Sequence, residues 1–132
     1  MTAKARNTWT WVLRVLAAGI MLQTLYFKFT ASPESVYIFS TVGMEPWGRI
    51  LVSVFELIAS VLILLPRTTA YGALIGIGVM TGAIFMHLTR LGIVVQGDSG
   101  QLFVYALLVL GSCLTLAYWQ RESLSGITRR ER

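Results

Sequence analysis

Two titratable side chains, Glu56 and His87, lie inside long apolar stretches of the sequence. An ionised carboxylate in apolar surroundings is unfavourable unless it is paired, so Glu56 is expected to be either paired or held neutral. His87 can accept or donate a proton near neutral pH. We therefore treat Glu56 and His87 as candidate catalytic residues that handle protons together. A purely structural ion pair is the alternative for Glu56.

Four further polar residues suggest the wall of a ligand pocket around these two. Gln23 and Tyr105 lie within apolar stretches, whereas Lys28 lies close to the end of the stretch that contains Gln23, and Arg90 close to the end of another. We predict that Gln23 and Tyr105 line the pocket and that Lys28 and Arg90 stand at its mouth. The alternative for the two basic residues is anchoring, because long basic side chains can extend from a helix end to a polar interface.

Several other kinds of site are not supported by the sequence. A single histidine and a single cysteine, Cys113, cannot form a usual metal cage or an internal disulfide, so no metal site is predicted. The sequence contains no phosphate-binding loop, nucleophile elbow or zinc-protease motif. The chemistry that the residues favour is therefore proton transfer to or from a bound ligand.

Membrane-spanning helices are the elements that must position these residues. The chain has 132 residues, of which 55% are hydrophobic and only 13% are charged, which is too apolar for an ordinary soluble domain of this size. Four apolar stretches are long enough to cross a bilayer as helices: residues 9–29, 47–65, 70–91 and 102–119. We predict an all-α fold, a single integral membrane four-helix bundle over residues 1–132.

The basic residues predict that both termini are cytoplasmic. In that orientation the cytoplasmic side carries eight of them: Lys4, Arg6, Arg14, Arg67, Arg121, Arg129, Arg130 and Arg132. The outer side carries three: Lys28, Arg49 and Arg90. This bias is typical of a multi-pass protein, and we expect the bacterial cytoplasmic (inner) membrane. Membrane topology thus explains the net charge of +5 better than nucleic-acid binding does.

The ends and connections of the spans carry their own signals. The first apolar stretch exceeds the roughly 15 residues of a signal-peptide core, so we expect a retained helix. Ser32, Pro33 and Gly43 have the residue types of helix boundaries and predict a short outer-surface helix at 33–42. The four-residue connection at 66–69 makes the second and third spans antiparallel neighbours. Residues 96–100 are predicted to form a polar turn.

Helical spacing predicts which face of each span turns inward, because lipid cannot satisfy polar groups. The predicted stripes are Gly19, Gln23, Tyr26 and Thr30; then Arg49, Ser53, Glu56 and Ser60; then Gly76, Met80, Ala83, His87 and Arg90; and finally Gln101, Tyr105, Leu108, Ser112, Thr115 and Trp119. Two glycine pairs in the third span, Gly72/Gly76 and Gly78/Gly82, predict close helix approach. Glu56 would lie roughly 13 Å below the outer end of its span.

The order of these features over about residues 11–119 resembles the DoxX-like family of small four-span membrane proteins. The resemblance rests on four segments: Phe27-Lys28-Phe29 before Ser32-Pro33, the stretch 42–46 with its glycine and proline, Phe55-Glu56-Leu57-Ile58-Ala59, and the turn at 65–72. His87 stands where many members have a histidine. The resemblance implies a four-helix membrane bundle and a redox setting, since members resemble subunits linked to quinone-dependent sulfur oxidation and to membrane oxidoreductase complexes.

Three functions fit the sequence. The leading hypothesis is an accessory subunit of a membrane redox complex, which need not itself be catalytic. Its bundle would offer a quinone or another lipophilic ligand a site in which Glu56 accepts a proton, while a partner supplies the electrons. The second hypothesis is a structural or assembly adaptor that docks on other membrane-protein subunits, with Glu56 fixing helix register. The third is a small transporter, which would require an oligomer because four short spans leave little room for a path.

Overall fold

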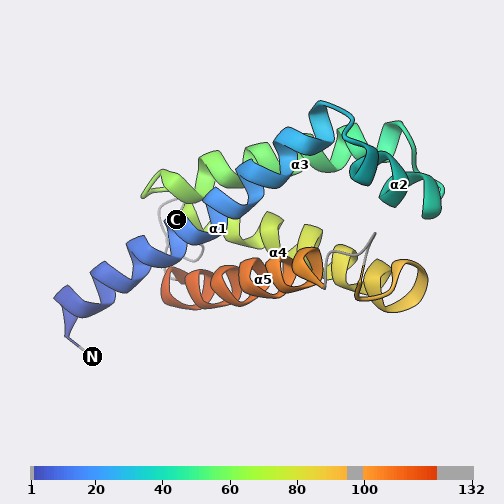
Figure 1. Ribbon diagram of the computed structural model, residues 1–132. Helices are drawn as coiled ribbons and strands as arrows, with labels where there is room; N and C mark the ends of the chain where they lie inside the picture. Colours follow the sequence, from blue (N-terminus) through green and yellow to red (C-terminus); the bar gives the residue numbers. More distant parts are fainter. Residues whose placement is uncertain (1, 95–99, 122–132) are drawn as a thin grey trace, which may run out of the picture.

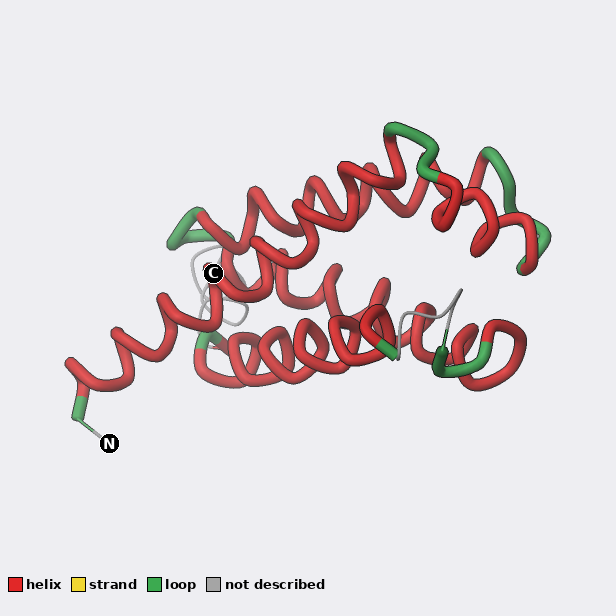
Figure 2. The backbone as a smooth tube through the Cα atoms, in the orientation of Figure 1, coloured by secondary structure: helices red, strands yellow, loops and turns green. Residues whose placement is uncertain are grey.

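The computed structural model describes residues 2–94 and 100–121, and all regular structure in these ranges is helical (Figure 2). The elements, labelled in Figure 1, are α1 (Ala3–Phe29), α2 (Pro33–Thr41), α3 (Trp47–Leu64), α4 (Thr69–Met86), the π-helix η1 (His87–Leu91) and α5 (Gln101–Trp119). Within the described ranges, four stretches are long and apolar enough to cross a membrane: α1, α3, α4 with η1, and α5. The predicted all-α membrane bundle is confirmed.

Two sequence predictions fall outside the described residues. The predicted polar turn at 96–100 is described only at Gly100, which has a positive φ of 87° and precedes α5. Three basic residues used to predict the orientation, Arg129, Arg130 and Arg132, also lie outside these ranges.

The long helices form a ring in the order α1, α3, α4, α5, because each packs against its two neighbours in that order. Figure 1 shows α1 beside α3 and α4 beside α5, and α2 packs at one end against α1, α3 and η1. At the other end, Nη2 of Arg6 donates a hydrogen bond of 2.6 Å to the carbonyl oxygen of Trp119. We name these two ends the α2 end and the terminal end.

The outer faces of the bundle are apolar. Large apolar side chains such as Leu51, Val61 and Leu114 are about half exposed. Water would make such a surface unfavourable, since contiguous apolar area in a soluble protein marks a binding site or promotes aggregation. A lipid bilayer removes that penalty, so these faces contact lipid.

Helices pack most closely near the terminal end, where α3 meets α4. A Cβ added to Gly72 would lie 2.7 Å from the carbonyl oxygen of Ala59 and 2.7 Å from the backbone nitrogen of Ile63. A Cβ at Gly76 would lie 2.7 Å from Sγ of Cys113 on α5. The first predicted glycine pair therefore mediates close approach, and any larger residue at Gly72 must move backbone.

The second glycine pair behaves differently. A Cβ added to Gly78 or to Gly82 would meet no atom within 4 Å. The prediction that this pair brings two helices together is wrong. The two residues instead lack close neighbours, and both line a cavity between the helices.

The inward face of α3 is the one that the sequence predicts, but that of α1 is not. All four predicted residues of α3, from Arg49 to Ser60, are buried. The four predicted residues of α1 are all exposed, and the buried face consists instead of Arg14, Ala17, Ala18, Met21 and Leu25. An error of one residue rotates a helix face by about 100°. A span that is apolar on both faces gives little signal to prevent such an error.

The stripes of the last two spans are partly correct. In α4 and η1, Gly76, Met80 and His87 are buried, whereas Arg90 is exposed. In α5 the fully buried positions are Ala106, Val109, Ser112, Cys113 and Leu116, of which the predicted stripe contained only Ser112. Packing against α1 and α4 therefore decides the inward face of α5.

Candidate functional site

A cavity of about 350 Å³ lies within the bundle toward the α2 end. Every element contributes to its wall, and most of the wall is apolar, with Met21, Met80, Met86 and Val109 among the lining residues. The polar residues that line it are Thr24, Lys28, Ser32, Glu34, Ser35, Glu56, His87 and Tyr105. An apolar space with a few polar groups is the usual form of a small-molecule site.

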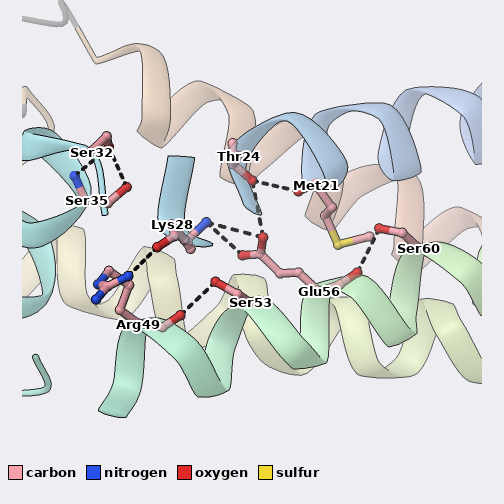
Figure 3. A network of polar contacts seen from close by, with 9 residues as sticks. All are labelled: Met21, Thr24, Lys28, Ser32, Ser35, Arg49, Ser53, Glu56 and Ser60. Carbon is pink, nitrogen blue, oxygen red and sulfur yellow. Dashed lines mark hydrogen bonds and ion pairs between the residues drawn. The ribbon is translucent and has the colours of Figure 1, made fainter. Parts of the chain in front are cut away.

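Glu56 on α3 forms an ion pair with Lys28 on α1 at the side of this cavity. The Nζ of Lys28 lies 3.1 Å from Oε1 and 3.2 Å from Oε2 of Glu56. The hydroxyl of Thr24, one turn before Lys28, donates a hydrogen bond of 3.2 Å to Oε2 (Figure 3). Glu56 is only 2% exposed, so these partners provide the stabilisation that water would otherwise give its charge.

Arg49 extends this network toward the beginning of α3. Its Nε lies 2.9 Å from Oε1 of Glu45, one turn earlier. Its Nη1 donates to the carbonyl oxygen of Lys28, as Figure 3 shows. The hydroxyl of Ser53 donates to the carbonyl oxygen of Arg49 at 2.7 Å. Arg49 therefore ties the last turn of α1 to the first turn of α3, which holds Lys28 within reach of Glu56.

His87 occupies the first position of the π-helix η1 and is 5% exposed. Its Nδ1 lies 2.9 Å from the carbonyl oxygen of Gly92, and its ring meets that of Phe103 edge to face at 5.6 Å between centroids. Gly92 has a positive φ of 78°, a conformation that glycine adopts without a steric penalty. Short π-helical segments are rare and frequently occur at functional sites.

Tyr105 on α5 completes the polar part of the wall. The side-chain amide of Gln101, one turn earlier, donates a hydrogen bond of 2.7 Å to its hydroxyl oxygen. Tyr105 itself is half-buried and lines the cavity. Its hydroxyl hydrogen has no hydrogen-bond acceptor among the described residues.

Glu56 and His87 share the cavity without contacting each other. Each has partners of its own: Lys28 and Thr24 for Glu56, and Gly92 for His87. No hydrogen bond joins the two side chains in the described part of the chain. Proton transfer between them would therefore need a molecule in the cavity, and each is placed to act on that molecule separately.

The structure places two of the predicted pocket residues elsewhere. Gln23 is exposed and does not line the cavity, and Thr24 takes the place predicted for it. The reason is the wrong helical phase assigned to α1. Arg90 is also exposed and away from the cavity wall, because the helix widens to η1 one turn before it. Lys28, Glu56, His87 and Tyr105 are the predicted residues that the structure brings to one cavity.

Sequence reasoning missed the role of Arg14 at the opposite end. Its Nε donates to the carbonyl oxygen of Ile63 at 2.8 Å, and its Nη2 donates to that of Leu64 at 2.6 Å. Its guanidinium also lies 3.7 Å from the centroid of the Trp11 ring. Arg14 therefore satisfies carbonyl groups at the C-terminal end of α3. The signal in the sequence was an arginine inside an apolar stretch, because such a charged group needs hydrogen-bond partners within the protein.

The donor set does not suit a metal ion. No group of three or more histidine, cysteine, aspartate or glutamate side chains is gathered within residues 2–94 and 100–121. The cavity instead combines an apolar volume with an ion pair, an imidazole and a phenol. This arrangement can hold a lipophilic molecule and exchange hydrogen bonds or protons with its polar head.

Comparison with known proteins gives one match. The family model of DoxX matches residues 10–89, which is more than half of the chain. This range contains Lys28, Glu56 and His87 but ends before Tyr105. No curated protein and no solved structure matches the chain.

Proposed function

The chain belongs to the DoxX family, and from that premise we propose that it is an accessory subunit of a membrane redox complex whose cavity binds a quinone-type lipophilic ligand. Other membrane subunits or a soluble donor supply the electrons. The chain contributes the binding site and the groups that handle protons.

The observation that carries this proposal is the cavity of about 350 Å³ with its mixed wall. The apolar part of the wall suits the ring and the alkyl chain of a lipophilic ligand. Its polar part gathers Lys28, Glu56, His87 and Tyr105 from α1, α3, η1 and α5. A volume of this size falls at the lower end of small-molecule pockets, which span about 300–1,000 Å³.

Each polar residue then has a distinct role. Reduction of a quinone takes up protons, and side chains must deliver them where water is scarce. Glu56, held by Lys28 and Thr24, is the proton-accepting group that takes up a proton from the aqueous side and passes it to the reduced ligand, and His87 is a second proton site. Lys28 holds the carboxylate in position when no ligand is present, and Tyr105 orients the head of the ligand.

The orientation of the chain belongs to the same proposal. With both termini in the cytoplasm, as the basic residues predict, the cavity lies in the outer half of a bacterial inner membrane. The terminal end, with Arg14 and Arg6, then lies on the cytoplasmic side. Fluorescent or alkaline-phosphatase fusions at either terminus report this orientation directly.

Gentle purification from native membranes, followed by extraction and identification of bound lipophilic molecules, tests the proposal. We expect bound quinone and co-eluting membrane subunits. Replacing Ala106, which lines the cavity, with phenylalanine should abolish the bound quinone. The matched control is Leu107→Phe, because Leu107 is exposed and lies outside the cavity wall. Absence of quinone from the unaltered protein, tested also by adding decylubiquinone, would contradict the proposal.

A structural adaptor is the second candidate, and the closed polar network favours it. Glu56, Lys28, Arg49 and Glu45 are mutually paired, as expected of residues that only fix helix register. An adaptor should co-purify with its partner in the Glu56→Gln variant and carry no ligand. A quinone-binding subunit should instead lose quinone-dependent turnover of the assembled complex in the same variant.

A further inference from the structure

The cavity offers a ligand both a hydrogen-bond acceptor and a donor. The acceptor is on His87. Because the carbonyl oxygen of Gly92 can only accept, the hydrogen of the singly protonated imidazole must be on Nδ1. Nε2 is then an acceptor, and it has no hydrogen-bond partner among the described residues.

The free nitrogen of His87 faces open space rather than packed protein. In the described part of the chain, no buried side-chain nitrogen or oxygen lacks a hydrogen-bond partner. Nε2 must therefore border space that a water-sized molecule can reach. Because His87 is 5% exposed in all and lines the cavity, we assign that space to the cavity.

The donor is the hydroxyl group of Tyr105. Its oxygen already accepts a hydrogen bond from the amide of Gln101 at 2.7 Å. Its hydrogen remains available, because the structure shows no acceptor for it among the described residues. Both residues line the same cavity, His87 from η1 and Tyr105 from α5, and we assign the acceptor and the donor to it.

The charges of the wall disfavour an anionic head group. Three charged residues line the cavity: Lys28, Glu34 and Glu56. Lys28 and Glu56 neutralise each other, whereas Glu34 has no ion-pair partner within the described residues. The wall therefore carries net negative charge, which opposes the carboxylate of a fatty acid or a lipid phosphate. A neutral polar head fits better.

Resting on the proposed function, we infer that the cavity favours the reduced, hydroxyl-bearing form of its ligand, a quinol, over the matching quinone. The carbonyl groups of a quinone only accept hydrogen bonds, so Nε2 of His87 stays without a donor. A quinol hydroxyl donates to Nε2, and its oxygen can still accept from Tyr105. The quinol satisfies the acceptor Nε2, whereas the quinone leaves it unsatisfied. This difference corresponds to about a tenfold higher affinity for the quinol.

This preference has a second consequence that can be measured. A site that binds the reduced form more tightly raises the midpoint potential of the bound couple by linkage. For a two-electron couple, a tenfold preference corresponds to about 30 mV. A redox titration of protein-bound quinone therefore reports the same quantity as a binding ratio.

Binding of a matched redox pair tests the inference directly. Decylubiquinone and decylubiquinol are added in competition, without oxygen, to the full chain in lipid nanodiscs, and occupancy is read by native mass spectrometry. We expect decylubiquinol to bind about tenfold more tightly. Equal or weaker binding of the quinol would overturn the inference while leaving the proposed function intact. Failure of both forms to bind would overturn both.

A third probe separates a quinol site from a general site for lipophilic hydroxyl compounds. The same hydrogen bonds could hold an alkylphenol, so 4-decylphenol is measured beside the redox pair. Weaker binding of 4-decylphenol than of decylubiquinol supports the quinol. Equal binding would overturn the assignment to a quinol.

Two variants assign the preference to named atoms. In His87→Asn the side-chain amide can still donate to the Gly92 carbonyl, but the group at the position of Nε2 is gone. We expect the quinol-to-quinone affinity ratio to fall toward one. Tyr105→Phe should weaken both forms, with Tyr118→Phe, an exposed position on the same helix, as the matched control. An unchanged ratio in folded His87→Asn protein would overturn the assignment to Nε2.

Discussion

The two ends of the bundle are stabilised by different means. At the terminal end, glycine and small side chains let backbones touch, and Ile63, Cys113 and Leu116 are fully buried. At the α2 end, the helices are linked by the ion pair of Lys28 with Glu56 and by the hydrogen bonds of Arg49. A cavity opens between the helices at the α2 end.

The difference explains why a cavity can persist inside so small a protein. Close packing leaves no space, because side chains fill the volume between helices as they do in organic crystals. Polar links act at a few points and fix the helix ends without filling the space between them. An end that must admit a ligand is therefore better stabilised by such links than by packing.

Basic side chains have different roles at the two ends. Arg14 is buried and donates to backbone carbonyls at the end of α3, so it completes a helix terminus. Lys28 pairs with a carboxylate at the cavity wall, where a ligand can compete for either partner. The first contact supports the fold alone, and the second is available for function.

The largest expected effect is at the ion pair of the α2 end. Glu56→Leu leaves the ammonium group of Lys28 without its partner, and we expect it to lower the free energy of unfolding by about 3 kcal/mol. Adding Lys28→Met to this variant should restore most of that loss, because no unpaired charge then remains. Circular dichroism recorded during unfolding in sodium dodecyl sulfate measures the free energy of unfolding of the single and the double variant. A double variant no more stable than Glu56→Leu alone would show that the pair does not stabilise this end.

The next effect contrasts two glycines of α4. Gly72→Ala places a Cβ against backbone atoms of α3 and should lower the free energy of unfolding by about 2 kcal/mol. Gly78→Ala meets no atom within 4 Å and should instead raise it by about 0.5 kcal/mol, because alanine favours helix. Thermal unfolding of the two variants in the same detergent compares them. Equal destabilisation would show that the ends do not differ in packing.

Arg14→Met tests the polar contact of the terminal end. It removes two hydrogen bonds from a charged donor, leaves two carbonyl groups without those donors and keeps a long apolar side chain. We expect a loss of about 1.5 kcal/mol in the free energy of unfolding. Binding of decylubiquinone should stay unchanged, since Arg14 does not line the cavity. A loss of binding together with full stability would contradict the separation of the two ends.

The smallest effect concerns the turn between α1 and α2. Ala31 has a φ of 54°, in the left-handed region that costs a residue with a Cβ about 1 kcal/mol. Ala31→Gly removes this strain but makes the unfolded chain more flexible, so a net gain of about 0.5 kcal/mol is expected. Thermal unfolding should show this gain in stability as a small rise in the melting temperature. A fall would mean that the methyl group of Ala31 stabilises the α2 end through contacts.

The membrane setting of this protein and the number of its spans follow from the amino-acid sequence alone. The apolar stretches are too long and too numerous for a soluble fold, and their lengths match a bilayer. It also marked Glu56 and His87, because a titratable group in an apolar stretch stands out whatever the packing. The buried face of α3 followed as well, since its polar residues share one face.

Which residues contact one another depends on how the helices pack. Gln23 and Thr24 are neighbours in sequence, yet only Thr24 faces the cavity, because a rotation of about 100° separates them. In lipid, both faces of a helix are apolar, so hydrophobic periodicity does not identify the inward face of α1 as it would in water. The pairing of Lys28 with Glu56, the contact of Arg14 with α3 and the cavity itself arise from how the helices pack.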